Sequence, residues 1–138
     1  TMANTLYDSG RTLMLSSFDW AATPIDIYLV KTQGTNPYTV NSSTHDNLDD
    51  VPVASRIAGP IALGSKTVVN GAADAADVTF PTVIGDTAQA LILCKHTGAD
   101  ATDTLIAYID TATGLPITPN GGDIIVTWDN GANKIFKL

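Results

Sequence analysis

Two pairs of residues in this chain carry side chains that can do nucleophilic or acid–base chemistry. Cys94 and His96 stand two positions apart in the stretch QALILCKH, and His45 directly precedes Asp46. A thiol beside an imidazole can act as a nucleophile, and an imidazole oriented by a carboxylate can act as a general base. Cys94 and His96 share one face of an expected strand, where side chains stand parallel and rarely reach attack geometry. We therefore expect an inert, buried thiol at Cys94 and an exposed imidazole at His96.

Other catalytic signatures are missing from the sequence. His45 lies in the most polar part of the chain, which favours a solvated imidazole, and the two histidines are too far apart for an HxxxH or HExxH zinc motif. The chain has no GxSxG elbow, no phosphate-binding GxxxxGK[ST] loop and no GxGxxG fingerprint. We predict that the protein is not an enzyme and has no catalytic, cofactor-binding or metal residues. A hydrolase built on two aspartates is a third hypothesis, which requires a deep cleft and a raised carboxylate pKa.

Asp, Asn and Gly are concentrated near the C-terminus, in YIDTATGLPITPNGG and DIIVTWDNGANKIFKL. An EF-hand loop ends in a glutamate ligand, and this chain contains no glutamate. The DNG triplet between IIVTW and KIF instead predicts a hairpin, because Asn and Gly tolerate the positive φ of a type I′ turn. Asp46, Asp49 and Asp50 remain the alternative for a weak calcium site.

The aromatic residues allow two interpretations. Trp20, Trp128 and the four tyrosines can form a sugar-stacking platform, but at strand spacing such residues are more often core or cross-strand partners. A carbohydrate-binding protein would expose Trp20 or Tyr38, so their burial distinguishes the two interpretations.

Composition limits the class of protein. A chain of 138 residues with 44% hydrophobic residues is expected to form one folded domain. The net charge is −7 and seven Lys and Arg residues are scattered, which argues against nucleic-acid and anionic-membrane partners. We find no apolar run of about 18–20 residues, so no membrane span is expected, and no basic-then-apolar start typical of Sec export. Cys94 is the single cysteine, which excludes an intrachain disulfide and a cysteine zinc cluster.

Residues 3–18 predict a short amphipathic helix. The apolar positions at helical offsets are Leu6, Tyr7, Leu13, Met14 and Phe18. Such a stripe covers a β core or, alternatively, docks on a partner. We expect Asn4 or Thr5 to cap this helix and Gly10 to weaken it by about 1 kcal/mol.

The remaining chain, residues 25–138, is predicted to form a β core. The expected strands are those in TPIDIYLVK (half-buried), near 66–70 and 77–80, QALILCK (covered on both faces), DTLIAYID, DIIVTWD (with Ile124, Val126 and Trp128 on one face) and KIFKL. Asn70-Gly71 predicts a turn, although residues 72–76 make the connection to the next strand too long for a two-residue hairpin. A long loop at 32–56, with a short strand at Tyr38–Val40, is the expected contact surface together with the N-terminal segment. The fold class is mainly β, a single-domain antiparallel sandwich or barrel with a short N-terminal helix.

Three stretches resemble a family of small structural proteins from tailed bacteriophages. They are LIAYIDTATGLPITPNGGDIIVTWDNGANKIFKL, NTLYDSGRTLMLS and GAADAADVTFPTVIGDTAQALIL, and the resemblance is most specific over residues 105–138. It implies a virion structural protein, a capsid decoration or cement protein that bridges capsid subunits. The resemblance supplies no catalytic or ligand residues.

The partners expected from this resemblance are the major capsid protein and further copies of the chain, in a dimer or trimer. The protein would be made in the host cytoplasm and reside on the capsid surface, where an acidic exterior repels DNA. A carbohydrate- or receptor-binding module of a tail or head fibre is the alternative.

Overall fold

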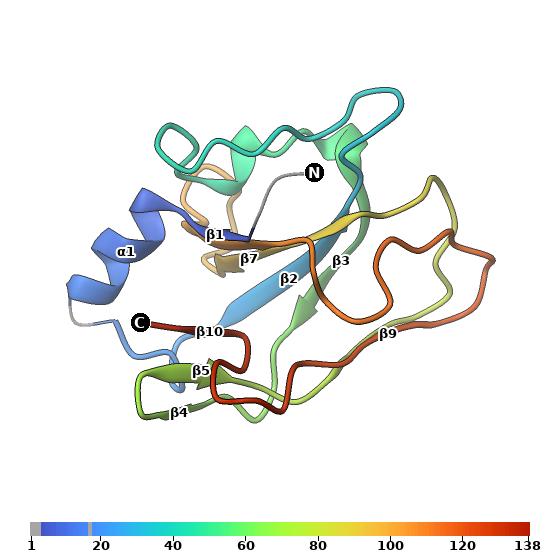
Figure 1. Cartoon of the computed structure of the whole chain (residues 1–138). Helices are drawn as coiled ribbons and strands as arrows, with labels where there is room; N and C mark the ends of the chain where they lie inside the picture. Colours follow the sequence, from blue (N-terminus) through green and yellow to red (C-terminus); the bar gives the residue numbers. More distant parts are fainter. Residues whose placement is uncertain (1–3, 17) are drawn as a thin grey trace.

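The computed structural model describes residues 4–16 and 18–138 (Figure 1). The elements, in chain order, are β1 (Thr5–Leu6), α1 (Asp8–Leu15), β2 (Ile25–Val30), the 3-10 turns η1 (Leu48–Asp50) and η2 (Val53–Ser55), β3 (Arg56–Ala62), β4 (Thr67–Val69), β5 (Ala72–Asp74), β6 (Val78–Phe80), β7 (Ala90–Lys95), β8 (Leu105–Ile109), β9 (Ile124–Val126) and β10 (Phe136–Lys137). None of the helices in these residues has the length and apolar character needed to cross a bilayer.

The strands form three antiparallel sheets. The largest has the order β1-β8-β7-β2-β3, a second has the order β10-β5-β4, and β6 pairs with β9. The smaller sheets pack against one face of the largest one, below it in Figure 1, and the described strands do not close into a barrel. The predicted mainly β, sandwich-like fold with a short N-terminal helix is confirmed.

Both faces of the large sheet are covered. Ile25, Ile27 and Leu29 of β2 join the core toward the smaller sheets, whereas Tyr28 and Val30 join a second core on the other face. All six residues of β2 are buried, so the prediction of a half-buried strand is wrong. β7 is covered on both faces, as predicted from its continuous apolar run.

The segment between β2 and β3 forms the cover of that second core. Tyr38, Val40, Leu48 and Val51 from this segment are buried against the sheet. Residues 38–40 are not a strand, contrary to prediction; Tyr38 and Val40 are held by packing instead. The inner side of the loop that was predicted as a contact surface is thus packed against the large sheet.

The helix is shorter than predicted. It spans Asp8–Leu15 and not 3–18, because Thr5 and Leu6 pair with β8 and the amide of Tyr7 still donates to Ile106 O at 3.1 Å. Tyr7 is the N-cap residue, without a side-chain hydrogen bond, so the prediction of an Asn4 or Thr5 cap is wrong. Residues 3 and 17 of the predicted range lie outside the described residues.

The Asn70-Gly71 turn is tighter than expected. Val69 pairs directly with Ala72 across it, and both turn residues have positive φ, 52° for Asn70 and 79° for Gly71. These are the requirements of a two-residue type I′ hairpin. The prediction that the insert was too long is wrong, because the alanine-rich stretch itself forms β5.

The predicted C-terminal hairpin is also wrong. β9 pairs with β6 and β10 pairs with β5, so the strands on either side of Asp129-Asn130-Gly131 belong to different sheets. Asp129 Oδ1 accepts a hydrogen bond from the amide of Gly131 at 3.0 Å, which stabilises a local turn. The predicted inward face of DIIVTWD is confirmed, since Ile124, Val126 and Trp128 are all buried.

Candidate functional site

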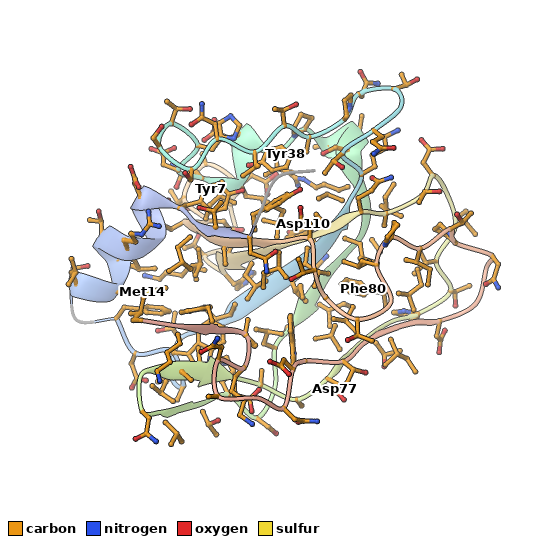
Figure 2. All side chains as sticks on the ribbon, in the orientation of Figure 1. Tyr7, Met14, Tyr38, Asp77, Phe80 and Asp110 are labelled. Carbon is orange, nitrogen blue, oxygen red and sulfur yellow. The ribbon has the colours of Figure 1, made fainter. Side chains whose placement is uncertain are left out.

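A hollow lined mainly by apolar side chains lies between α1 and the small sheet of β10, β5 and β4. Its volume is about 260 Å³, and its lining residues include Met14, Phe18, Trp20, Val68, Ala73, Phe136 and Leu138. Met14 lies on the side of α1 that faces the C-terminal segment (Figure 2). The Trp20 and Phe136 rings, which line it, meet edge to face at 5.4 Å, and Trp20 Nε1 donates to Asp74 O at 3.0 Å.

Large apolar side chains stand exposed at this hollow. Leu138 and Val68, which line it, are 68% and 53% exposed, and Leu15, next to Met14 in the last turn of α1, is 90% exposed. We call Val68, Leu138 and the hollow the apolar surface. Grouped exposed apolar residues mark contact sites more often than singly scattered ones do. The geometry therefore indicates a surface for protein contact.

The structure separates Cys94 from His96. Cys94 is fully buried in the second core, whereas the His96 side chain is half exposed and its Nδ1 lies 2.8 Å from Asp26 Oδ2. No hydrogen bond between the two side chains occurs in the described part of the chain. The thiol and the imidazole thus do not form a nucleophilic pair in this structure.

Cys94 is expected to be unreactive in the folded protein. Burial raises the pKa of its thiol, and the nearby carboxylates of Asp103 and Asp26 raise it further. Because the thiol is inaccessible and stays protonated, labelling by an aromatic disulfide reagent should remain slow from about pH 5 to 9. Guanidinium-unfolded protein should label quickly, and faster as the pH rises. Rapid labelling of the folded protein would contradict this expectation.

His45 belongs to a chain of hydrogen bonds and is not simply solvated. Its Nδ1 lies 3.0 Å from the hydroxyl of Tyr38, which lies 2.6 Å from the hydroxyl of Tyr7. Both tyrosines are buried, Tyr38 on the inner side of the segment between β2 and β3 (Figure 2), and burial raises the pKa of Tyr38 to about 12. The partner of His45 is therefore Tyr38, and the described hydrogen bonds do not include one between His45 and Asp46. This network fastens the covering segment to the sheet.

The three aspartates proposed for calcium do not share a site. Asp50 Oδ2 accepts hydrogen bonds from the amides of Asp46 and Asn47, at 2.9 and 3.4 Å. Burial alone would raise the pKa of Asp50, but these amides outweigh it and the pKa is lowered. The Asp50 side chain thus helps to cap the N-terminus of η1. Asp46, Asp49 and Asp50 do not converge within the residues that the structure describes.

The aromatic residues proposed for sugar stacking are internal. Trp20, Trp128, Tyr38 and the other three tyrosines are all buried, with the tryptophans 4% and 6% exposed. Trp128 Nε1 donates to Ala76 O at 3.1 Å, which satisfies its polar edge inside the fold. The core interpretation of these residues is confirmed.

Sequence reasoning missed two functional candidates. Val68 and Leu138 come from separate segments, and no local pattern shows that they line one hollow. Asp26 and Asp103, which lie beside His96, were not singled out either; an aspartate within an otherwise apolar strand was the available signal. Comparison of the chain with protein-family models and with curated proteins gives no match.

Proposed function

We propose that the chain is a virion structural protein of a tailed bacteriophage, a head decoration protein that binds the outside of the capsid and bridges its subunits. The observation that carries this proposal is the apolar surface, where Val68 and Leu138 stand exposed at the hollow between α1 and the small sheet. The resemblance of residues 105–138 to phage structural proteins supplies the setting. The partner is the major capsid protein, and a dimer or trimer of the chain is the expected assembly.

The shape of the fold suits such a task. Its cores lie on both faces of the large sheet, so the exposed apolar residues are free for contact with another chain. The net charge of −7 favours an exterior position, because an acidic surface repels packaged DNA. The alternative, a carbohydrate- or receptor-binding module of a fibre, lacks support from the aromatic residues, since its two proposed anchors, Trp20 and Tyr38, are buried.

The proposal predicts that Val68→Asp combined with Leu138→Asp abolishes binding to capsid shells depleted of this protein. Each introduced carboxylate would have to give up its hydration in the contact, and the apolar area that the native side chain buries there would be lost. Wild-type protein should bind saturably and raise the melting temperature of the shells, by mass action. Sedimentation of protein with shells, followed by calorimetry of the pellet, measures both effects.

Ile84→Asp is the matched control. Ile84 is 73% exposed but lines a different part of the molecule, so this variant should bind shells like wild type. Failure of the wild-type protein to bind would contradict the proposed function. Equal binding by the double variant would contradict the assignment of the apolar surface. Loss of self-association alone in the double variant would show that the surface joins copies of the chain.

A further inference from the structure

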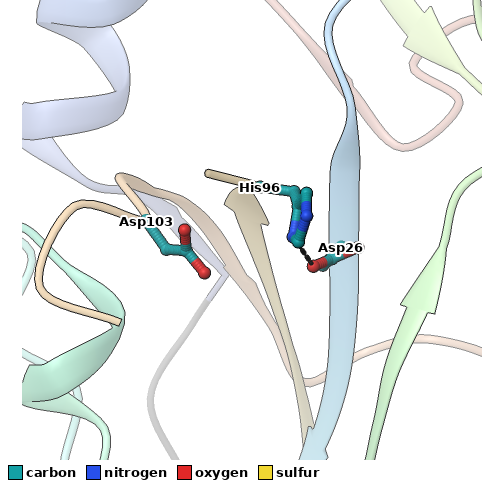
Figure 3. A group of neighbouring side chains, drawn as sticks. All are labelled: Asp26, His96 and Asp103. Carbon is teal, nitrogen blue, oxygen red and sulfur yellow. Dashed lines mark hydrogen bonds and ion pairs between the residues drawn. The ribbon is translucent and has the colours of Figure 1, made fainter. Parts of the chain in front are cut away.

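Three polar side chains from distant positions meet at one end of the large sheet (Figure 3). Asp26 is the second residue of β2, His96 follows the end of β7, and Asp103 lies in the turn that leads into β8. Their ligand atoms lie within 4.8 Å of one another. This cluster is separate from the apolar surface and takes no part in the proposed capsid contact.

The two carboxylates are held in place by the fold. Asp103 Oδ1 accepts hydrogen bonds from the amide and the hydroxyl of Thr97, at 2.7 and 2.6 Å. Asp26 Oδ2 lies 2.8 Å from His96 Nδ1. The second oxygen of each carboxylate accepts no hydrogen bond from the described residues. Neither of these two oxygens is fully shielded from solvent. Each carboxylate thus has one anchored oxygen and one that remains available to a ligand.

The charges at this cluster do not balance. Asp26 and Asp103 are only 6% and 3% exposed, and burial of a carboxylate is unfavourable unless hydrogen bonds or a cation compensate it. Within the described residues, no lysine or arginine forms an ion pair with either carboxylate. His96 can supply one positive charge at most. A divalent cation would balance both carboxylates.

The ligand types select the kind of cation. Calcium and magnesium favour sites built entirely of oxygen, whereas an imidazole nitrogen with two carboxylate oxygens suits zinc and its neighbours. Tetrahedral zinc with bonds of about 2.1 Å places its ligands roughly 3.4 Å apart, so the 2.8 Å contact between His96 Nδ1 and Asp26 Oδ2 would open slightly as the three side chains gather around the ion. We propose that Asp26, His96 and Asp103 form a binding site for one divalent transition-metal ion of the zinc class.

The ion would fasten the turn before β8 to β2 and β7. Three protein ligands leave the fourth position of a tetrahedral site for water. The fully buried Cys94 belongs to the core and is not one of the ligands. The expected consequence is stabilisation that depends on metal concentration.

The proposal is tested by titrating the chelator-treated 138-residue chain with Zn²⁺ and, separately, with Co²⁺. We expect one ion to bind per chain, and the melting temperature to rise by about 10 °C when free Zn²⁺ exceeds its Kd about 100-fold. Co²⁺ should give the intense visible bands of a four- or five-coordinate ion, without the thiolate charge-transfer band that a cysteine ligand adds. His96→Gln should weaken binding more than about tenfold and remove the visible bands.

Three further variants complete the test. His45→Gln removes the other histidine and should bind both ions like wild type. Asp26→Asn and Asp103→Asn keep side-chain size and an acceptor oxygen, and each should weaken binding; circular dichroism checks that each is folded. Absence of saturable Zn²⁺ and Co²⁺ binding by the wild-type protein would overturn the proposal. Visible bands that persist in His96→Gln, or disappear in His45→Gln, would do the same.

Discussion

Replacing Gly10 by alanine is expected to destabilise the protein by about 2–4 kcal/mol, although alanine favours an isolated helix by about 1 kcal/mol over glycine. A Cβ atom at this position would lie 2.7 Å from Ile106 O and 2.9 Å from Ile106 Cα. The helix cannot easily move away, because the Tyr7 amide donates to Ile106 O and the Ser9 hydroxyl donates to Leu105 O at 2.9 Å. Urea unfolding followed by tryptophan fluorescence measures the change.

Thr12→Ala is the matched control for Gly10. Thr12 lies on the same helix but is exposed, so its replacement should change the free energy of unfolding by less than about 0.5 kcal/mol. A Gly10→Ala variant as stable as wild type would mean that α1 does not approach β8 as closely as the structure has it. The glycine that appears from sequence as a weak point of the helix is thus the residue that permits its packing.

The second large effect is expected for Arg56→Ala, a loss of about 2–4 kcal/mol. The guanidinium is largely buried and donates to three partners in two segments: Leu48 O at 2.9 Å, Val51 O at 2.8 Å and Asp100 Oδ2 at 2.9 Å. It also lies 5.5 Å from the centre of the Tyr28 ring. Alanine would leave carbonyls of the covering segment without these partners. The Asp100 pair itself contributes little, because that carboxylate is 46% exposed.

Chemical denaturation and hydrogen exchange measure the effect of Arg56. Amides of residues 48–55 should exchange faster in Arg56→Ala, because the covering segment loses its attachment to β3. Arg56→Lys should recover little of the loss, since an ammonium cannot reproduce the planar set of donors. Arg11→Ala, which breaks the exposed pair with Asp8, should be nearly neutral. Equal stability of Arg56→Ala and Arg11→Ala would contradict the assigned role.

Two turn signals show what the sequence could and could not predict. Asn70-Gly71 and Asp129-Asn130-Gly131 both carry the residues of a tight hairpin, yet only the first forms one. The residues after Gly71 pair at once with β4, whereas those after Gly131 find their partner in β5, far back in the chain. Local turn chemistry predicts that the chain bends, but strand pairing depends on distant partners that one sequence does not reveal.

Burial was predictable where the pattern was local. The alternation in DIIVTWD and the apolar run in QALILCK indicated their buried faces correctly. The second face of β2 was not predictable, because its cover comes from an irregular segment whose Tyr38 and Val40 have no regular period. Such a segment reads as a loop, although its inner side chains complete a core.

The cluster of Asp26, His96 and Asp103 could not be predicted without knowing the strand register. His96 was considered with Cys94, its neighbour along the same strand, but its partner is Asp26 across the sheet. Asp26 pairs with Cys94, so His96 lies two positions further along on the same face, the diagonal neighbour of Asp26. The apolar surface has the same origin, since three separate segments form it.

The number of copies of this chain in separated phage heads and tails tests the central claim most directly. Quantitative mass spectrometry of fractionated virions gives that number relative to the major capsid protein. A decoration protein follows the symmetry of the shell, so we predict on the order of hundreds of copies with the heads and none with the tails. A few copies found only with the tails, or none in the virion, would contradict the account.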